Sequence, residues 1–189
     1  MAILHPAQLS PSKPEILRGF LAGRSWGATG ELEILGAYRF DDPAGEVGIE
    51  CHLVRVDGTI YHLPLTYRSE PLDGAEEHLV ATMQHSVLGE RFVQDGLHDE
   101  VALDCFRRAL SGEQEQAVLE VHGEDGTVRE VRPQSVTLNL EIDEGAQAPS
   151  DDELLDGTEF LIARTLGGLD GAVRLVARWD GGSGVVAAL

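Results

Sequence analysis

The sequence predicts an α+β fold, a strongly curved antiparallel β-sheet with two helices packed on it. Three observations predict it: apolar residues alternate with polar ones in several short segments, Asp-Gly pairs separate some of these segments, and two further segments carry apolar residues at helical spacing. The chain has 189 residues, of which 42% are hydrophobic. We therefore expect one domain spanning residues 1–189, with a real hydrophobic core.

The first element is predicted to be a helix within residues 10–24, SPSKPEILRGFLAGR. Ser12 and Glu15 have the spacing of a capping box, Pro14 lies in the first turn, and Gly23 ends the pattern. One side of this helix is apolar and consists of Ile16, Leu17, Phe20 and Leu21.

After this helix the period changes to two, which indicates strands. The first alternating set is Leu32, Ile34, Gly36, Tyr38 and Phe40. A hairpin then follows at Asp57-Gly58, where a two-residue turn makes paired positions sum to 115, so that Val54 faces Tyr61. We expect the core side of the sheet to be the face with His52, Val54, Val56, Tyr61, Leu63, Leu65 and Tyr67.

Two more strands are predicted at residues 78–85 and 90–97, joined by a tight turn near Gly89, although residues 76–84 alone also fit a helix. A second helix is expected between Asp99 and Gly112. Its apolar positions are Ala102, Leu103, Cys105, Phe106, Ala109 and Leu110.

The remaining segments predict strands around a second Asp-Gly turn at residues 125–126 and a half-buried strand at residues 135–142. An acidic polar loop is expected at residues 143–157. It is followed by a C-terminal hairpin at residues 159–180, turned by GGLDG, and by a glycine-rich tail.

Charge restricts the classes of partner. With 14 Lys and Arg against 33 Asp and Glu, the formal net charge is −19, which repels phosphate backbones and anionic lipids. We therefore expect neither a nucleic-acid nor a membrane partner. No leader or spanning segment is recognisable, so a cytoplasmic location is predicted. Cys51 and Cys105 lie in apolar contexts without CxxC spacing, which favours two buried thiols.

His98, Asp99 and Glu100 stand side by side at the predicted start of the second helix. In one interpretation they form a catalytic or metal-binding group. In the other, Asp99 is the N-cap and Glu100 lies in the first turn, where the helix dipole favours negative charge. The second interpretation accounts for both carboxylates, and arginines at the far end of the helix complete the same charge pattern.

Other patterns do not predict a reactive site. His52 and His62 fall on opposite faces of their hairpin, and the spacing of His78 and His85 does not suit chelation either. The DDELLDG segment lacks the ligand spacing of an EF-hand, and the glycines of SWGATG are too sparse to cradle a nucleotide. We therefore predict no catalytic residue, no cofactor and no metal.

Several short motifs resemble the N-terminal cap domain of bacterial maltokinases. They are Arg24-Ser25-Trp26-Gly27-Ala28 after the first helix, Tyr61-His62-Leu63-Pro64-Leu65 at the end of a strand pair, and the run from Phe92 to Asp99 before the second helix. The resemblance covers residues 14–112. It departs from the family after Trp26, where no lysine follows the glycines.

The resemblance implies a cystatin-like cap fold, a curved antiparallel sheet with a packed helix. In the family this cap precedes kinase lobes that phosphorylate maltose with ATP. The sequence contains no recognisable nucleotide-clamping Lys and Glu pair and no HxD catalytic loop followed by Asn. We therefore expect a non-catalytic, stand-alone cap-like protein, an interaction or regulatory module whose partner is an enzyme of α-1,4-glucan, trehalose or maltose metabolism.

The alternative is a small-ligand binding domain, in which the concave face of the sheet holds a sugar or an apolar molecule. The candidate lining residues are Trp26, Tyr38, Tyr61, Tyr67 and Trp179. The same aromatic residues also fit an ordinary core. The identity of the partner or ligand, the oligomeric state, the presence of a cavity and the role of the acidic loop stay open.

Overall fold

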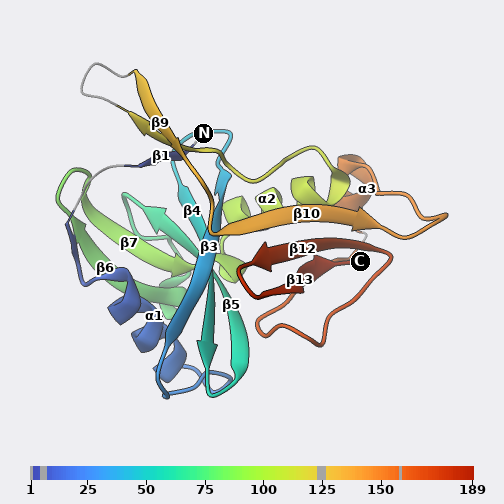
Figure 1. Cartoon of the computed structure of the whole chain (residues 1–189). Helices are drawn as coiled ribbons and strands as arrows, with labels where there is room; N and C mark the ends of the chain where they lie inside the picture. Colours follow the sequence, from blue (N-terminus) through green and yellow to red (C-terminus); the bar gives the residue numbers. More distant parts are fainter. Residues whose placement is uncertain (1, 5–7, 123–126, 158) are drawn as a thin grey trace.

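Three β-sheets and three α-helices make up the part of the chain that the computed structural model describes, which is residues 2–4, 8–122, 127–157 and 159–189 (Figure 1). The largest sheet has six antiparallel strands in the order β2 (Leu9–Ser10), β6 (Leu79–His85), β7 (Gly89–Asp95), β5 (Thr59–Arg68), β4 (Gly48–Val56) and β3 (Glu33–Asp41). A four-stranded sheet has the order β10 (Val136–Ile142), β12 (Val173–Trp179), β13 (Gly182–Ala188) and β11 (Leu161–Ile162). The third sheet has the order β1 (Ala2–Leu4), β8 (Leu119–His122) and β9 (Val128–Arg132).

The helices are α1 (Lys13–Ala22), α2 (Glu100–Ser111) and α3 (Asp151–Leu155), with short 3-10 turns η1 (Glu76–His78) and η2 (Gly96–His98). The predicted α+β class and the curved antiparallel sheet are confirmed, and so are the first two helices. The third helix was not expected.

Both predicted helix ends follow from local chemistry. In α1, Ser12 is the N-cap residue, and its backbone N–H donates to Glu15 Oε2 at 2.8 Å. In α2, the Asp99 side chain accepts from the Val101 N–H, and Gly112 ends the helix with φ +82°, a left-handed conformation that glycine adopts without strain.

The hairpin register was predicted correctly. Val54 pairs with Tyr61 and His52 with Leu63 across β4 and β5, and Asp57-Gly58 forms the turn. The strands β6 and β7 also form as predicted, with Gly89 at φ +75° in their turn, so the helical alternative for residues 76–84 is wrong for most of that segment.

The prediction of one core side was wrong, because the six-stranded sheet is buried on both faces. The α1 face holds one core, made of Ile16, Leu17, Phe20, Leu21, Val54, Val56, Tyr61, Leu63, Leu65, Met83 and Val93. The opposite face, which we call the α2 face, holds a second core that includes Ile49, Cys51, Leu53 and Phe106 and continues into the four-stranded sheet with Leu175 and Ala187. A strand covered on both sides shows little alternation, which explains the nearly continuous apolar run of β4 and β5.

A β-bulge changes the predicted face of β3. Ile34 pairs with Val54 and Gly36 pairs with Leu53, so Leu35 is an extra residue between them. The alternation therefore shifts by one residue, and Ile34 is 48% exposed, whereas Tyr38 and Phe40 are buried as expected.

The predicted C-terminal hairpin at residues 159–180 is wrong. The strand β12 forms its hairpin with β13, where Trp179 pairs with Gly182 across a turn at Asp180-Gly181, and β11 pairs with the far edge of β13. The supposed glycine-rich tail is therefore a central strand of the four-stranded sheet. An Asp-Gly turn of the kind used for β4 and β5 was present in the sequence.

The acidic loop at residues 143–157 is not a loop throughout. It contains α3, which begins at Ser150 with a capping box to Glu153 and buries Leu154 in the second core. Arg107 of α2 forms an ion pair with Asp151 at the start of this helix. Burial of one leucine and this ion pair account for a helical turn in a segment that composition alone marks as polar.

The two large sheets are joined by backbone hydrogen bonds. The His62 N–H donates to Arg164 O at 2.9 Å, and the Leu166 N–H donates to Ile60 O at 2.9 Å, so the chain after β11 lies along the free half of the β5 edge. On the same path the Ala163 N–H donates to Val186 O in β13. The α2 helix lies between the two sheets and belongs to the core that they share.

The third sheet forms an arm that projects from the body of the molecule (Figure 1). Here β1 pairs with β8 in parallel and β8 with β9 antiparallel, and every residue of β9 is exposed. The predicted turn at residues 125–126 lies outside the described residues.

Candidate functional site

The cluster of His98, Asp99 and Glu100 does not gather its side chains at one point. Asp99 is fully buried and accepts hydrogen bonds from Thr66 Oγ1 at 2.6 Å and from Arg68 Nε and Nη2, each at 2.7 Å. Burial alone raises the pKa of Asp99, but the hydrogen bonds from Arg68 and Thr66 outweigh it and hold this pKa below its usual value. Asp99 therefore ties the start of α2 to β5.

The other two residues of this group point elsewhere. Glu100 is exposed, and His98 is exposed and stacks on His78, with ring centroids 3.5 Å apart and planes 2° from parallel. Burial lowers the pKa of His98, and the carboxylate of Asp95 opposes this shift only in part. The stack connects η1 to η2, and both Asp99 and His98 are used by contacts within the fold.

The two predicted opposite-face histidines are both buried. His62 Nδ1 lies 2.9 Å from Ala163 O, and since a carbonyl only accepts, this nitrogen carries the proton. The other ring nitrogen then accepts from the Tyr38 hydroxyl at 2.9 Å. Burial lowers the pKa of His62 to about 3, so the ring stays neutral. His62 joins β5, β3 and the segment after β11 on the α2 face, whereas His52 lies on the α1 face.

A polar cluster that the sequence analysis did not nominate lies on the α1 face, at the end where α1 begins. We call it the Glu50 cluster, and it consists of Lys13, Arg39, Glu50, His52 and Tyr67. Glu50 lies in β4, with a side chain only 11% exposed, and forms ion pairs with Lys13 and with Arg39 Nη2 at 3.0 Å. His52 Nε2 lies 3.4 Å from Glu50 Oε2 and 3.3 Å from the Tyr67 hydroxyl.

The electrostatics of the Glu50 cluster keep its carboxylate charged. Burial raises the pKa of Glu50, but His52, Lys13 and Arg39 together outweigh burial, and the pKa lies well below its usual value. Burial and the Glu50 charge raise the pKa of Tyr67 well above its usual value, so the phenol remains a neutral donor. The cluster thus combines one fixed carboxylate, two cations and a neutral hydroxyl.

A trace of this cluster existed in the sequence. Glu50 occupies the same face of β4 as His52 and Val54, a face that alternation assigned to the core. A carboxylate on a core face requires a partner, because burying an unpaired charge is strongly unfavourable. The partners Lys13 and Arg39 come from two other elements, and only the tertiary structure brings them there.

The five aromatic residues predicted to line a ligand site lie in two different places. Trp26, Tyr61 and Tyr67 belong to the α1 face, where the Trp26 and Tyr61 rings have centroids 6.4 Å apart. Tyr38 and Trp179 belong to the second core on the opposite face. The helix α1 covers much of the α1 face, and the side chains there that remain partly exposed include Trp26, Tyr67, Lys13 and Arg39.

Trp26 is held by its surroundings. The guanidinium carbon of Arg164 lies 4.9 Å from the Trp26 ring centroid, and the Phe20 ring meets Trp26 edge-on at 5.5 Å. Arg164 also forms an ion pair with the buried Asp95. A Cβ atom on Gly27 would lie 1.9 Å from Leu21 O, so the glycine after Trp26 allows the chain to pass against the end of α1.

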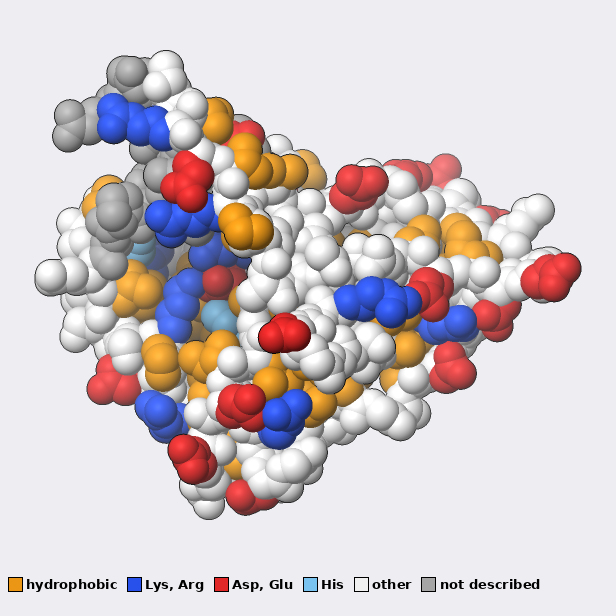
Figure 2. Space-filling view, viewed as in Figure 1, with side chains coloured by type: hydrophobic (Ala, Val, Ile, Leu, Met, Phe, Trp, Pro, Cys, Tyr) orange, Lys and Arg blue, Asp and Glu red, His pale blue; other side chains and the backbone are white. Residues whose placement is uncertain are grey.

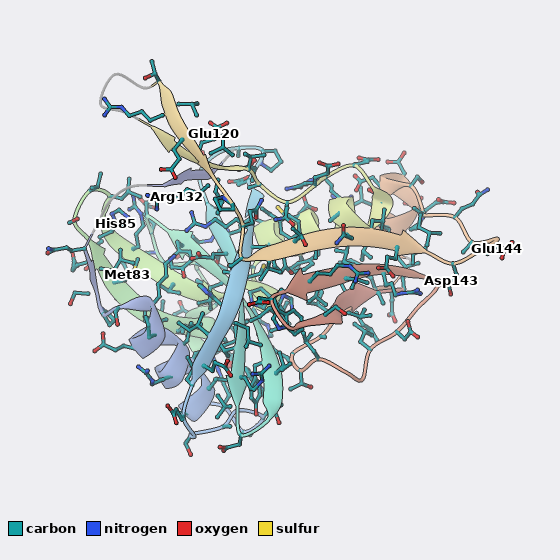
Figure 3. All side chains as sticks on the ribbon, in the orientation of Figure 1. Met83, His85, Glu120, Arg132, Asp143 and Glu144 are labelled. Atoms are coloured by element: carbon teal, nitrogen blue, oxygen red, sulfur yellow. The ribbon has the colours of Figure 1, made fainter. Side chains whose placement is uncertain are left out.

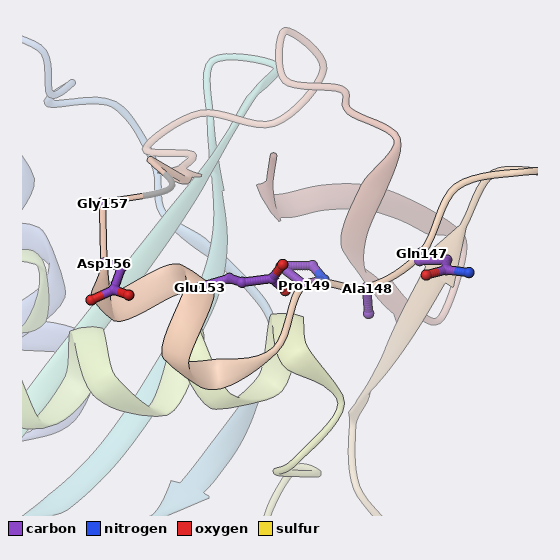
Figure 4. A pocket seen from close by; sticks show the side chains of 6 residues that line it. All are labelled: Gln147, Ala148, Pro149, Glu153, Asp156 and Gly157. Carbon is purple, nitrogen blue, oxygen red and sulfur yellow. The ribbon is translucent and has the colours of Figure 1, made fainter.

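Two hollows occur away from the Glu50 cluster. One, of about 510 Å³, lies beside α3 and is lined by Gln147, Ala148, Pro149, Glu153, Asp156 and Gly157 (Figure 4). The other, of about 550 Å³, lies at the C-terminal end of α2 and is lined by Asp41, Pro43, Arg108, Glu113, Gln114, Glu115, Gln116, Val118 and Glu120. Both linings are acidic.

Within the described residues, no group of three or more His, Cys, Asp or Glu side chains is arranged to hold a metal ion. None of the helices in the described ranges has both the length and the apolar character needed to cross a membrane.

Comparison with known proteins agrees with the sequence motifs. The family model of the maltokinase N-terminal cap domain matches residues 20–99. Neither a curated protein nor a solved structure matches the chain. The matched segment runs from the end of α1 through β3, β4, β5, β6 and β7 to Asp99, which is the greater part of the six-stranded sheet. Residues 20–99 of this chain therefore form a maltokinase N-terminal cap-like region, as the motifs predicted.

Proposed function

We propose that the chain is a non-catalytic interaction or regulatory module linked to α-1,4-glucan, trehalose or maltose metabolism. The observation that carries this proposal is the match of residues 20–99 to the maltokinase N-terminal cap domain. Further support comes from the buried polar groups. Asp99, Glu50 and His62 each bond to other residues of the fold, which is a structural use of their charge and hydrogen bonds.

The partner proposal is tested by capture and then by direct binding. The immobilised chain is incubated with native lysate at physiological salt, and bound proteins are identified by mass spectrometry. An unrelated protein of similar acidity serves as the control, because a net charge of −19 captures basic proteins without specificity. We expect an enzyme of α-glucan, trehalose or maltose metabolism, bound by the chain and not by the control.

The captured enzyme is then purified, and its affinity for the chain and its rate with and without the chain are measured. A saturable interaction that changes the rate supports regulation, and a saturable interaction without a rate change supports a scaffold role. Repeated recovery of no enzyme from this metabolism, with the chain folded on the support, would count against the proposal.

The second candidate function is binding of a small ligand on the α1 face of the six-stranded sheet. The Glu50 cluster favours it, since Lys13 and Arg39 have side chains 29% and 21% exposed and so reach solvent beside Tyr67. Thermal shift against maltose, trehalose, maltooligosaccharides and ATP tests it, because a ligand that binds the folded state raises the melting temperature. No stabilisation by any of these compounds removes its support from neutral sugars and nucleotides.

A further inference from the structure

The Glu50 cluster carries unused donors. Among the described residues, Glu50 is the hydrogen-bond partner of Lys13 Nζ and of Arg39 Nε and Nη2. A lysine ammonium has three N–H groups and an arginine guanidinium has five. Two N–H groups of Lys13 and the Nη1 group of Arg39 therefore have no acceptor in the described part of the chain.

A third cation belongs to the same face. Arg91 pairs with Met83 across β6 and β7, and Met83 is buried in the α1-face core. Since side chains of paired residues lie on the same side of a sheet, Arg91 also lies on the α1 face. Val93 pairs with Tyr67, so Arg91 is a diagonal neighbour of Tyr67, at a separation of roughly 7–8 Å between such positions.

Arg91 has no carboxylate partner within the described residues, where its guanidinium donates to the Glu90 carbonyl at 2.8 Å. Lys13, Arg39 and Arg91 thus bring three positive charges to a region that holds the single carboxylate of Glu50. Asp41 at the end of β3 lines the hollow beside Arg108. A local excess of cations is notable in a chain with a net charge of −19.

The surface views agree with this arrangement. Figure 2 shows a hollow below the β8–β9 arm in which basic, acidic and histidine side chains gather, the combination that makes up the Glu50 cluster. Figure 3 shows Met83 and His85 of β6 on this side of the molecule, with Glu120 and Arg132 of the arm above them. Asp143 and Glu144 lie at the opposite end of the molecule.

We propose that this end of the α1 face is a binding site for a small oxyanion of the phosphate class, held by Lys13, Arg39 and Arg91 beside Tyr67. The free N–H groups of Lys13 and Arg39 and the guanidinium of Arg91 donate to the phosphate oxygens, and the Tyr67 hydroxyl adds a neutral donor. Glu50 fixes the position of Lys13 and Arg39 and lowers the affinity for an anion through its own charge. This proposal deepens the ligand-binding candidate and is independent of the enzyme-partner proposal.

The test measures the dissociation constant of the intact chain by isothermal titration calorimetry at low ionic strength. The probes are inorganic phosphate, glucose 1-phosphate and glucose, with sodium chloride at matched ionic strength as the control. We expect phosphate and glucose 1-phosphate to bind and glucose and chloride to give no heat of binding. Tighter binding of glucose 1-phosphate than of phosphate identifies a phosphorylated sugar as the ligand, and equal binding identifies free phosphate.

The variants Lys13→Gln and Arg91→Gln should each weaken phosphate binding by on the order of tenfold, as expected for the loss of one charge close to the anion. Glu50→Gln keeps the shape of the side chain and should tighten phosphate binding by a similar factor. This opposite sign is specific to the proposal, because a purely structural ion pair predicts no gain in affinity.

Arg55→Gln is the matched control, because Arg55 lies on the same strand as Glu50, pairs with Glu33 at 2.6 Å and changes the net charge by the same amount. It should leave phosphate binding unchanged. Circular dichroism establishes that each variant is folded, and if Glu50→Gln is not, Lys13→Gln and Arg91→Gln decide the matter. No phosphate binding above the chloride control, or an equal loss in Arg55→Gln, would overturn the proposal. A variant that loses phosphate but still binds the partner enzyme leaves the proposed function intact.

Discussion

The role assigned to Asp99 makes a quantitative prediction about Asp99→Asn. Asparagine is as good an N-cap as aspartate, so the substitution retains the cap of α2 and removes the charge. The ion pair it removes is largely buried, with an exposed side-chain fraction of 0% for Asp99 and 21% for Arg68. Breaking a buried pair costs roughly 3–5 kcal/mol, and partial exposure of Arg68 reduces this, so we expect a loss of about 2–4 kcal/mol in the free energy of unfolding.

The assay is equilibrium urea denaturation followed by tryptophan fluorescence, with Trp26 on the α1 face and Trp179 in the second core. Asp99→Ala should lose about 1 kcal/mol more, because it also removes the cap. Glu100→Gln is the control at the same helix start and should lose only about 0.3–1 kcal/mol, since Glu100 is exposed and acts through the helix dipole alone.

The pH dependence of Asp99→Asn has a definite sign. The pKa of Asp99 is below its ordinary value of 3.8 in the folded chain. The stability that its charge contributes is therefore fully present above that ordinary value and is lost as the pH falls through the folded value. The difference between the wild type and Asp99→Asn should be constant near neutral pH and should shrink in acid. If Asp99→Asn unfolds with unchanged free energy at neutral pH, Asp99 is not a structural anchor and the functional interpretation of this group returns.

The remaining predictions concern the cores and one buried histidine. Leu17→Ala, at a fully buried position of α1, should cost about 2–5 kcal/mol in urea denaturation, whereas Leu155→Ala, 61% exposed, should cost under about 0.5 kcal/mol; equal costs would contradict the packing of α1. Gly27→Ala should lower the melting temperature because its Cβ would meet the α1 backbone, whereas Gly168→Ala, with nothing within 4 Å, should not; similar melting temperatures would disprove this close approach. His62 stays neutral when folded, with a pKa of about 3 against 6.5 for a free histidine, so the unfolded chain binds the extra proton and stability falls as the pH decreases from about 6.5 towards 3. In His62→Gln this loss should be smaller by about 1.4 kcal/mol for each pH unit in that window, as measured by denaturation at several pH values, and an unchanged pH dependence would show that the ring is not buried neutral.

The elements that the sequence determined are those set by near neighbours. The α1 cap at Ser12, the α2 cap at Asp99 and the hairpin at Asp57-Gly58 each depend on residues within a few positions, so local hydrogen bonding and backbone conformation fix them. The family resemblance was also readable, because motifs such as Tyr61-His62-Leu63-Pro64-Leu65 are contiguous.

The elements that the sequence did not determine depend on distant partners. The bulge at Leu35 shifts one strand by a residue, and its effect on Ile34 depends on pairing with β4. The strand β13 was mistaken for a tail because glycine and alanine carry little apolar pattern, and its place is fixed by pairing on both sides. Local alternation does not contain this information.

The candidate site shows the same division. Sequence alone placed His52 and Tyr67 on one face of the hairpin, and the register confirms this placement. Their meeting with Lys13, Arg39 and Glu50 was decided by the tertiary structure, which lays the start of α1 across the sheet. An apolar pattern determines which residues are buried together, because burial depends on periodicity, whereas the charges that meet at the edge of a core depend on how separate elements pack.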